Sequence, residues 1–101
     1  MPRPRKNCRC RPHHGDRVFK PRSIPMSRLT AINLTLSELE AMRHCDLDGL
    51  DQEAAGRNMA VSRGTVQRLL KSGRAKVLQA LIHSKALIIA KGDHHETLRT
   101  D

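Results

Sequence analysis

The feature that most constrains the fold is the stretch 62–84, in which small and apolar residues recur at helical spacing. These residues are Val66, Leu69, Leu70, Gly73, Val77, Ala80 and Leu81. Side chains at such intervals share one face of a helix, so the pattern predicts a long amphipathic helix with its stripe facing a core. Ser62, at its start, is a favoured N-cap residue. The fold must therefore be arranged around one helix that ends near Ser84.

A shorter helix is predicted immediately before the long one. Asp51 is a suitable N-cap for a helix over 51–59, and the helical pattern is then interrupted at Ala60 and Val61. The inner face of this helix is small, which allows a neighbouring helix to cross closely. Two helices joined by a turn of about three or four residues have the spacing of a helix-turn-helix.

Three residues at the predicted crossing support this interpretation. Ala55 and Gly56 provide the small inner face, and Val61 fills the corner together with Val66 of the long helix. The stretch 52–70 therefore predicts a helix-turn-helix whose second helix has an exposed N-terminus.

A third helix is predicted over about 37–48. Its start is marked by a capping box in one of two registers, Ser37 with Glu40 or Thr35 with Glu38. Its apolar side consists of Leu39, Met42 and Cys45. Cys45 is interpreted as a small buried residue.

Two short β-prone segments flank the helical region. Residues 30–35 alternate in hydropathy, and the apolar run 86–90 has the right length to pair with 30–34. The segment 18–28 contains two prolines and is expected to be extended along the domain. Its expected apolar anchors are Phe19, Ile24 and Met26.

The composition agrees with a small, mainly α-helical fold. Phe19 is the only aromatic residue, and apolar residues make up 38% of the 101-residue chain, so a large β-sandwich or an aromatic ligand pocket is not expected. We expect a helix-turn-helix three-helix core, a small two-stranded sheet and a flexible basic N-terminal arm. The expected division is an arm over 1–17, a DNA-binding domain over 18–91 and a disordered tail over 92–101.

The charge is concentrated in two blocks. The net charge is +9; residues 1–30 carry a net +8, residues 31–60 a net −4, and residues 61–91 a net +7 with no acidic side chain. A surface that served solubility alone would mix both signs. The asymmetry therefore favours a polyanionic partner, and double-stranded DNA fits the predicted motif.

The exposed face of the long helix carries side chains suited to DNA. Arg63 and Arg68 match the acceptor pair of guanine, and Gln67 matches the edge of adenine. Thr65 suits a thymine methyl or a phosphate, and Gly64 allows close approach. The candidate DNA-binding residues are Arg63, Gly64, Thr65, Gln67, Arg68, Lys71 and Arg74, with Lys71, Arg74 and Lys76 placed along the DNA backbone.

The chain resembles domain-of-unknown-function family 134, small prokaryotic proteins predicted to bind DNA. The matching stretches are PRPR, FKPRSIPM, LTLSELEAMRHCDLDGL, DQEAAGRNMAVSRGTVQRLL and RAKVLQALIHSKALII. The helix-turn-helix of that family is similar to that of sigma-factor region four. The resemblance implies a DNA-binding role, with Arg63, Thr65, Gln67 and Arg68 on the recognition helix, and no known target.

Three residues depart from the pattern of that family. Ala60 stands where glycine is usual, so a positive φ there would cost about 1 kcal/mol. Gly56 stands where alanine is usual, which weakens its helix by about 1 kcal/mol. Gly73 also stands where alanine is common. The departures bear on stability more than on function.

A cluster of thiols and imidazoles lies in the N-terminal arm. Cys8, Cys10, His13 and His14 are residue types that bind zinc, although a Cys-x-Cys spacing is tighter than most structural zinc sites. The alternatives are a reduced basic arm that follows DNA and a redox-sensitive pair. The leading interpretation assigns no metal and no cofactor.

We therefore expect a sequence-specific DNA-binding protein that acts as a transcriptional regulator, with a recognition helix at about 62–72 in the major groove. The basic arm would track phosphates or enter the minor groove. The alternatives are a protein-interaction module that docks on the transcription machinery and a metal or redox sensor built on the thiol and imidazole cluster.

An enzyme is not expected, because no catalytic constellation is visible. The acids Glu38, Glu40, Asp46 and Asp48 are interpreted as helix-start charges and a solvated face. No apolar run is long enough to cross a bilayer, so a soluble cytoplasmic protein is expected. A homodimer, paired through the edge of 86–90, would explain recognition of two half-sites.

Overall fold

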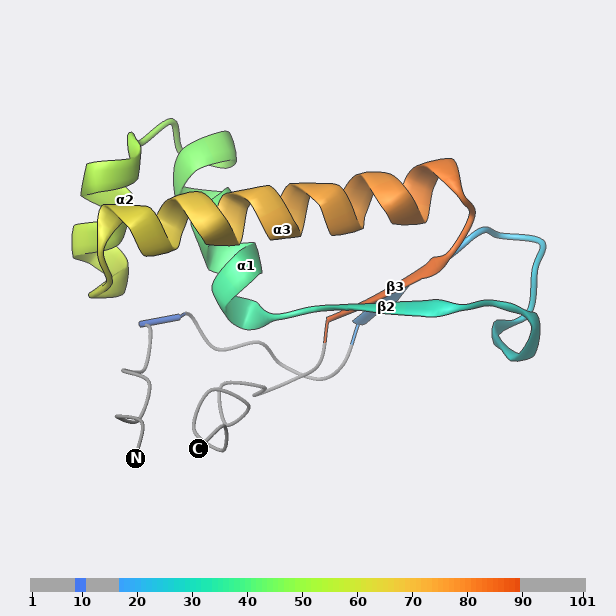
Figure 1. Ribbon diagram of the computed structural model, residues 1–101. Coiled ribbons are helices and arrows are strands. Elements are labelled where there is room, and N and C mark those ends of the chain that lie inside the picture. The colour runs from blue at the N-terminus through green and yellow to red at the C-terminus, as the bar shows by residue number, and fades with distance from the viewer. Residues whose placement is uncertain (1–8, 11–16, 90–101) are drawn as a thin grey trace, which may run out of the picture.

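The computed structural model describes residues 9–10 and 17–89, which form three helices and a small mixed sheet (Figure 1). In chain order, the elements are strand β1 (Arg17–Phe19), the 3-10 helix η1 (Met26–Arg28), strand β2 (Ala31–Leu34), helix α1 (Leu36–Met42), the π-helix η2 (Arg43–Leu47), helix α2 (Gln52–Met59), helix α3 (Arg63–Ile82) and strand β3 (Ala86–Ile89). None of these helices combines the length and apolar character needed to span a membrane. The residues expected to form the disordered tail lie outside the described part of the chain.

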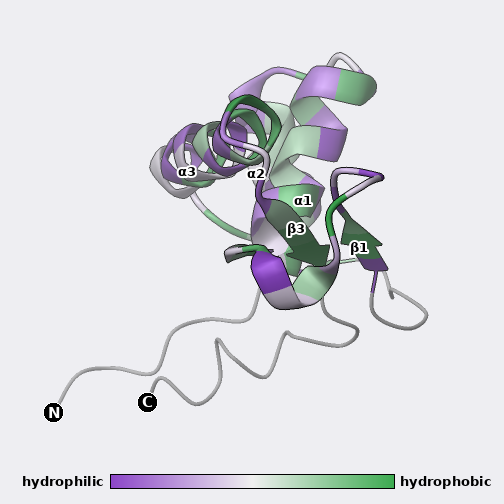
Figure 2. Cartoon of the chain, turned by 90° about the vertical axis from the view of Figure 1, so that its right-hand side faces the viewer, coloured by the Kyte–Doolittle hydropathy of each residue, from purple (hydrophilic) through white to green (hydrophobic). Residues whose placement is uncertain are grey.

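The sheet has three strands in the order β1-β3-β2. β3 pairs in parallel with β2, from Ala31 opposite Ala86 to Leu34 opposite Ile89, which confirms the predicted pairing. The prediction of only two strands is wrong, because Arg17–Phe19 adds an antiparallel strand on the other side of β3. Figure 2 shows that β1 and β3 are largely hydrophobic. Both edges of β3 are thus occupied, so the exposed edge that was expected there is wrong over residues 86–89, and homodimer formation stays a prediction.

The capping box of α1 uses the Thr35 register. The Glu38 backbone N–H donates to Thr35 Oγ1 at 3.1 Å, and the Thr35 N–H donates to Glu38 Oε1 at 3.0 Å. The Ser37 register is not used, since Ser37 is buried and the Glu40 carboxylate faces Arg43 and His44 instead. After Met42 the helix widens into the π-helix η2.

The N-caps and the turn around α2 and α3 confirm the prediction. Asp51 Oδ1 accepts from the Ala54 N–H at 2.8 Å, and Ser62 Oγ accepts from the Thr65 N–H at 3.1 Å. Between the helices, Ala60 has φ 61° and ψ 42°, the left-handed conformation that the family pattern indicated for this position.

Two apolar clusters form the core, and α3 contributes to both. Ala41, Ala55, Met59, Val66 and Leu70 form the cluster between the three helices. Leu34, Leu36 and Ile89 form the cluster beside the sheet, with Val77 of α3 packed against it. The predicted stripe of α3 is therefore confirmed except at Leu81, which is exposed because nothing in the described chain covers the outer side of the C-terminal half of α3.

Two expectations about burial are wrong. Phe19 and Met26 do not anchor the segment 18–28: both are exposed, since β1 is an outer strand and η1 has no buried residue, whereas Ile24 is half-buried. Glu38 and Glu40 do not form a solvated face, because both side chains are buried against polar partners.

Candidate nucleic-acid interface

Helix α2 lies directly against the turn that leads into α3. A Cβ atom on Gly56 would lie 2.7 Å from the Val61 carbonyl oxygen, closer than real contacts allow. The Val61 N–H donates to the Gly56 carbonyl at 2.9 Å, which holds the turn against the helix. Val66 is fully buried and Val61 packs against the same cluster, so the predicted close crossing and filled corner are confirmed.

The first turn of α3 is fixed by polar contacts among its own side chains. Ser62 Oγ and Thr65 Oγ1 are 3.0 Å apart, and Arg68 Nη2 donates to Thr65 Oγ1 at 3.3 Å. Arg63 Nη1 donates to Gln52 Oε1 at 3.4 Å, which links α3 to the start of α2. The hydroxyl of Thr65 therefore supports the cap and orients Arg68. Gln52 was not a candidate from the sequence, because its contact joins two different helices.

Four of the candidate residues form one exposed group on the outer face of α3. They are Arg63, Gln67, Arg68 and Lys71. Residues 61–89 contain no acidic side chain to offset them. We call this group, together with Gly64, the outer basic face.

Gly64 has no internal reason to be glycine. A Cβ atom there would make only ordinary contacts, 3.8 Å from Arg68 Nη1 and 3.9 Å from Ser62 Oγ. Its φ is not in the left-handed region, and glycine weakens a helix relative to alanine. The packing of the fold therefore does not require the absence of a side chain at Gly64 in the first turn of α3.

Arg74 is held by an acid from another element. Its Nε and Nη2 atoms donate to the two carboxylate oxygens of Asp46 at 3.0 and 2.7 Å. This hydrogen bonding lowers the pKa of Asp46 and raises the pKa of Arg74. Sequence reasoning missed the pairing because Asp46 lies in η2 and no spacing relates it to α3. Whether Arg74 contacts phosphate stays a prediction.

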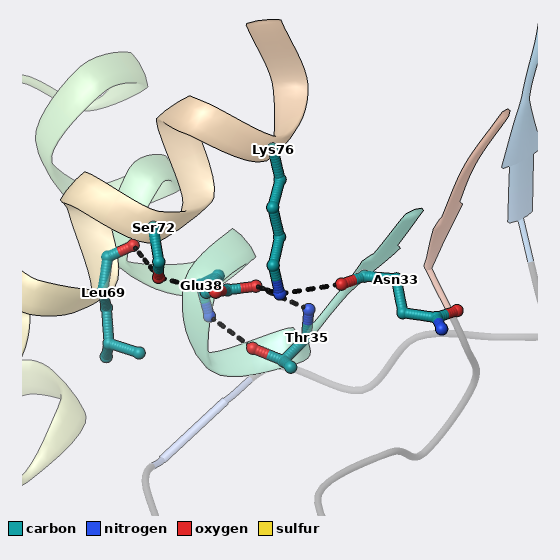
Figure 3. A network of polar contacts seen from close by, with 6 residues as sticks. All are labelled: Asn33, Thr35, Glu38, Leu69, Ser72 and Lys76. Carbon is teal, nitrogen blue, oxygen red and sulfur yellow. Dashed lines mark hydrogen bonds and ion pairs between the residues drawn. The ribbon is translucent and has the colours of Figure 1, made fainter. Parts of the chain in front are cut away.

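A polar network directs the Lys76 side chain toward α1 and β2 and so joins these two elements to α3 (Figure 3). Glu38 accepts from Ser72 Oγ at 2.6 Å and from Lys76 Nζ at 2.8 Å, and the same Nζ donates to the Asn33 carbonyl at 2.8 Å. Burial raises the pKa of Glu38, but hydrogen bonds from Lys76, Ser72 and Thr35 outweigh it and leave the pKa below its usual value. Lys76, expected along the DNA backbone, is therefore engaged elsewhere.

Only part of the N-terminal arm can be placed. Cys8, His13 and His14 lie outside the described residues. Cys10 packs against the sheet-side cluster, with its Sγ 4.0 Å from Ser37 Oγ, and the Arg9 N–H donates to the Met59 carbonyl at 2.9 Å. Over residues 9–10 and 17–89, no group of three His, Cys, Asp or Glu side chains is placed to hold a metal ion. The arm thus reaches the end of α2, directly before the turn.

The fold and this site define a small, basic, mostly helical protein that presents an acid-free helix face beside a tight interhelical turn. The chain belongs to the family described as "Protein of unknown function DUF134", whose profile matches residues 1–97. This confirms the resemblance seen in the sequence.

Several curated relatives carry the name UPF0251 protein. The relative from Pelotomaculum thermopropionicum is 46% identical over 93 residues, which cover 92% of this chain and 70% of the relative. The relative from Halothermothrix orenii is 45% identical, covering 93% of this chain and 70% of the relative. The relative from Methanosarcina acetivorans is 42% identical, covering 88% and 87%. No solved structure matches the chain.

Proposed function

We propose that the protein binds double-stranded DNA sequence-specifically and acts as a transcriptional regulator, with the first half of α3 as a recognition helix in the major groove. The observation that carries this proposal is the outer basic face, which lies on a capped helix directly after a tight turn. A helix presented in this way matches the width of the major groove.

The residues of the face divide into two roles. Gln67 and Arg68 lie in the first turns of α3 and suit base edges, and Arg63 beside them is oriented by Gln52. Lys71 lies one turn later and suits a phosphate. Base contacts specify the sequence, whereas phosphate contacts position the protein.

The test compares Arg68→Ala with Arg74→Ala on a site selected from random-sequence DNA and on random DNA. Arg68→Ala should weaken binding to the selected site by about 1–3 kcal/mol and relax the preference at one base pair. Arg74→Ala should weaken both DNAs about equally and reduce the slope of log affinity against log salt by about 0.9, as expected for one lost phosphate contact.

Two further variants serve as controls for charge. Asp46→Asn frees Arg74 from its partner, so it should strengthen binding to both DNAs. Arg28→Ala removes one exposed positive charge from η1. It should leave unchanged the ratio of affinities for the selected site and for random DNA, and the base preferred at each position of the site. If Arg68→Ala weakens random DNA as much as the selected site, the recognition-helix assignment fails. If no variant changes DNA binding, the proposal itself fails.

A further inference from the structure

An apolar groove lies at the end of α3 opposite the outer basic face. It has a volume of about 310 Å³ and runs between the segment that follows β1 and the C-terminal half of α3. Its apolar lining comes from Phe19, Pro21, Val77, Ala80, Leu81 and Leu87. In Figure 1 the chain after β1 lies beside the connection from α3 to β3, which is where the groove is formed.

The lip of the groove continues into an exposed apolar surface. Phe19 is 56% exposed and Leu81 is 71% exposed. Leu78 and Ile82 are 56% and 69% exposed. Leu78 lies three residues before Leu81 and four before Ile82, so the three side chains are neighbours on the helix surface beside the groove. A contiguous patch of exposed apolar side chains is typical of an interaction site, whereas apolar residues on ordinary solvated surface are scattered singly.

The charge around the groove selects the kind of partner. Lys20 and Lys85 line it, and neither of the two segments that form it, 17–30 and 61–89, contains an acidic residue. Lys20 Nζ donates to the carbonyls of Pro21 and Ile24 at 3.1 and 2.7 Å, so these partners are neutral groups that leave its charge unbalanced. A second copy of the chain would bring like charges together, whereas an acidic partner would complement them.

We propose that this groove docks an amphipathic helix of a protein partner, one that presents leucine or phenylalanine on one face and aspartate or glutamate beside it. The apolar face would enter the groove along α3, and the acids would meet Lys20 and Lys85. The site is independent of the proposed DNA contact, since Gln67 and Leu81 are about 21 Å apart along the helix axis. The protein would then hold a partner at one end of α3 and DNA at the other.

The experiment measures fluorescence anisotropy of the full chain with labelled peptides about 18 residues long, a length that allows a helix to form. One peptide has leucines at i, i+3, i+4 and i+7 among glutamates. A second has the same composition in scrambled order, and a third has lysine in place of glutamate. We expect the first to bind at least about tenfold more tightly than either other peptide, because both the pattern and the charge are needed.

Variants then locate the binding. Leu81→Ser and Phe19→Ser should each weaken the first peptide by about tenfold, as expected for loss of a buried apolar side chain. Leu47→Ser removes an equally exposed leucine from η2 and should have no effect. Arg68→Ala should also leave peptide binding unchanged, so the failure of one proposal does not imply the failure of the other.

Three results would overturn the proposal. Equal binding of the ordered and scrambled peptides would mean general attraction to a basic protein. A wild-type dimer that Leu81→Ser converts to a monomer in sedimentation equilibrium would mean that a second copy occupies the groove. A full chain that binds the peptide only after Leu98→Ser would mean that its own C-terminal segment occupies it.

Discussion

At the residue scale, Gly64 differs from the other two glycines of α2 and α3 in its surroundings. The glycines at 56 and 73 are enclosed: added Cβ atoms would lie 2.7 Å from the Val61 carbonyl and 2.8 Å from Met42 Sδ. Gly64 faces no such contact, yet it lies in the middle of the outer basic face. A glycine inside a helix costs about 0.5–1 kcal/mol relative to alanine, and no contact within the described chain requires that cost here.

Gly64→Ala should therefore raise stability while it weakens DNA binding. We expect the free energy of unfolding to rise by about 0.5–1 kcal/mol in urea titrations. Affinity for a selected DNA site should fall at least about tenfold, or roughly 1.4 kcal/mol. Ala75→Gly, on the exposed surface of the same helix, is the matched control: it should lower stability by a similar amount and leave affinity unchanged. Unchanged affinity of Gly64→Ala would show that no ligand approaches this turn closely.

Among individual residues, the capping residues are those whose contacts the sequence predicts best. Asp51 and Ser62 act within three residues of themselves, so their partners could be read from the sequence. Asp46 with Arg74, and Glu38 with Ser72 and Lys76, join elements far apart in the chain. Their pairing depends on how the helices cross, which local pattern does not determine.

At the element scale, the turn between α2 and α3 stores conformational strain. Ala60 is held at φ 61° by the Val61-to-Gly56 hydrogen bond and by the burial of Met59 and Val66 on either side. An L-residue in this conformation costs about 1–2 kcal/mol relative to a right-handed one. The strain is maintained because the two helices pack around it.

Ala60→Gly should stabilise the protein by up to about 1 kcal/mol, because glycine adopts positive φ without the Cβ clash but loses more entropy on folding. Thermal unfolding followed by circular dichroism measures the change. Gly56→Ala should do the opposite, since its Cβ would meet the Val61 carbonyl. A less stable Ala60→Gly variant would contradict the left-handed turn.

The elements differ in how well the sequence predicts them. The sequence predicts α2 and α3 together with their N-caps, because the apolar spacing and the capping residues indicate the same helix starts. β1 was missed because three residues are too few to show an alternating pattern, and its partner β3 lies about seventy residues away. The π-helix η2 was missed for a related reason: it continues the helical pattern of α1 and differs only in its hydrogen bonds.

At the scale of the whole molecule, Glu38 joins the parts that hold α3 in place. One carboxylate binds the N-cap of α1 and two residues of α3, and Lys76 extends the network to β2 (Figure 3). Exposure of Gln67, Arg68 and Lys71 followed from the helical wheel alone. The orientation of α3 against the sheet depends on this network and on the two clusters, and was not open to prediction.

Stability should fall in acid as Glu38 is protonated. Its pKa in the folded state is below the ordinary value of 4.5, so its contribution is complete above that pH and is lost as the pH falls through the folded value. Glu38→Gln should cost about 1.5–3 kcal/mol near pH 7, measured by urea unfolding, and progressively less as the pH falls through the folded-state pKa. Glu53→Gln, on the exposed first turn of α2, is the control and should change little. A difference that stays constant with pH would contradict the ionised network.

The order of the strands has a consequence for how the chain acquires its fold during synthesis. β1 and β2 are hydrogen-bonded only to β3, the last of the three strands to leave the ribosome. Residues 17–34 therefore emerge early and have no sheet partner until Ile89 has been made. This segment contains two prolines and four basic side chains, residue types that oppose pairing of an exposed strand with other chains. The sheet therefore cannot be completed before β3 has been synthesised, whereas α1, α2 and α3 all precede β3 in the chain.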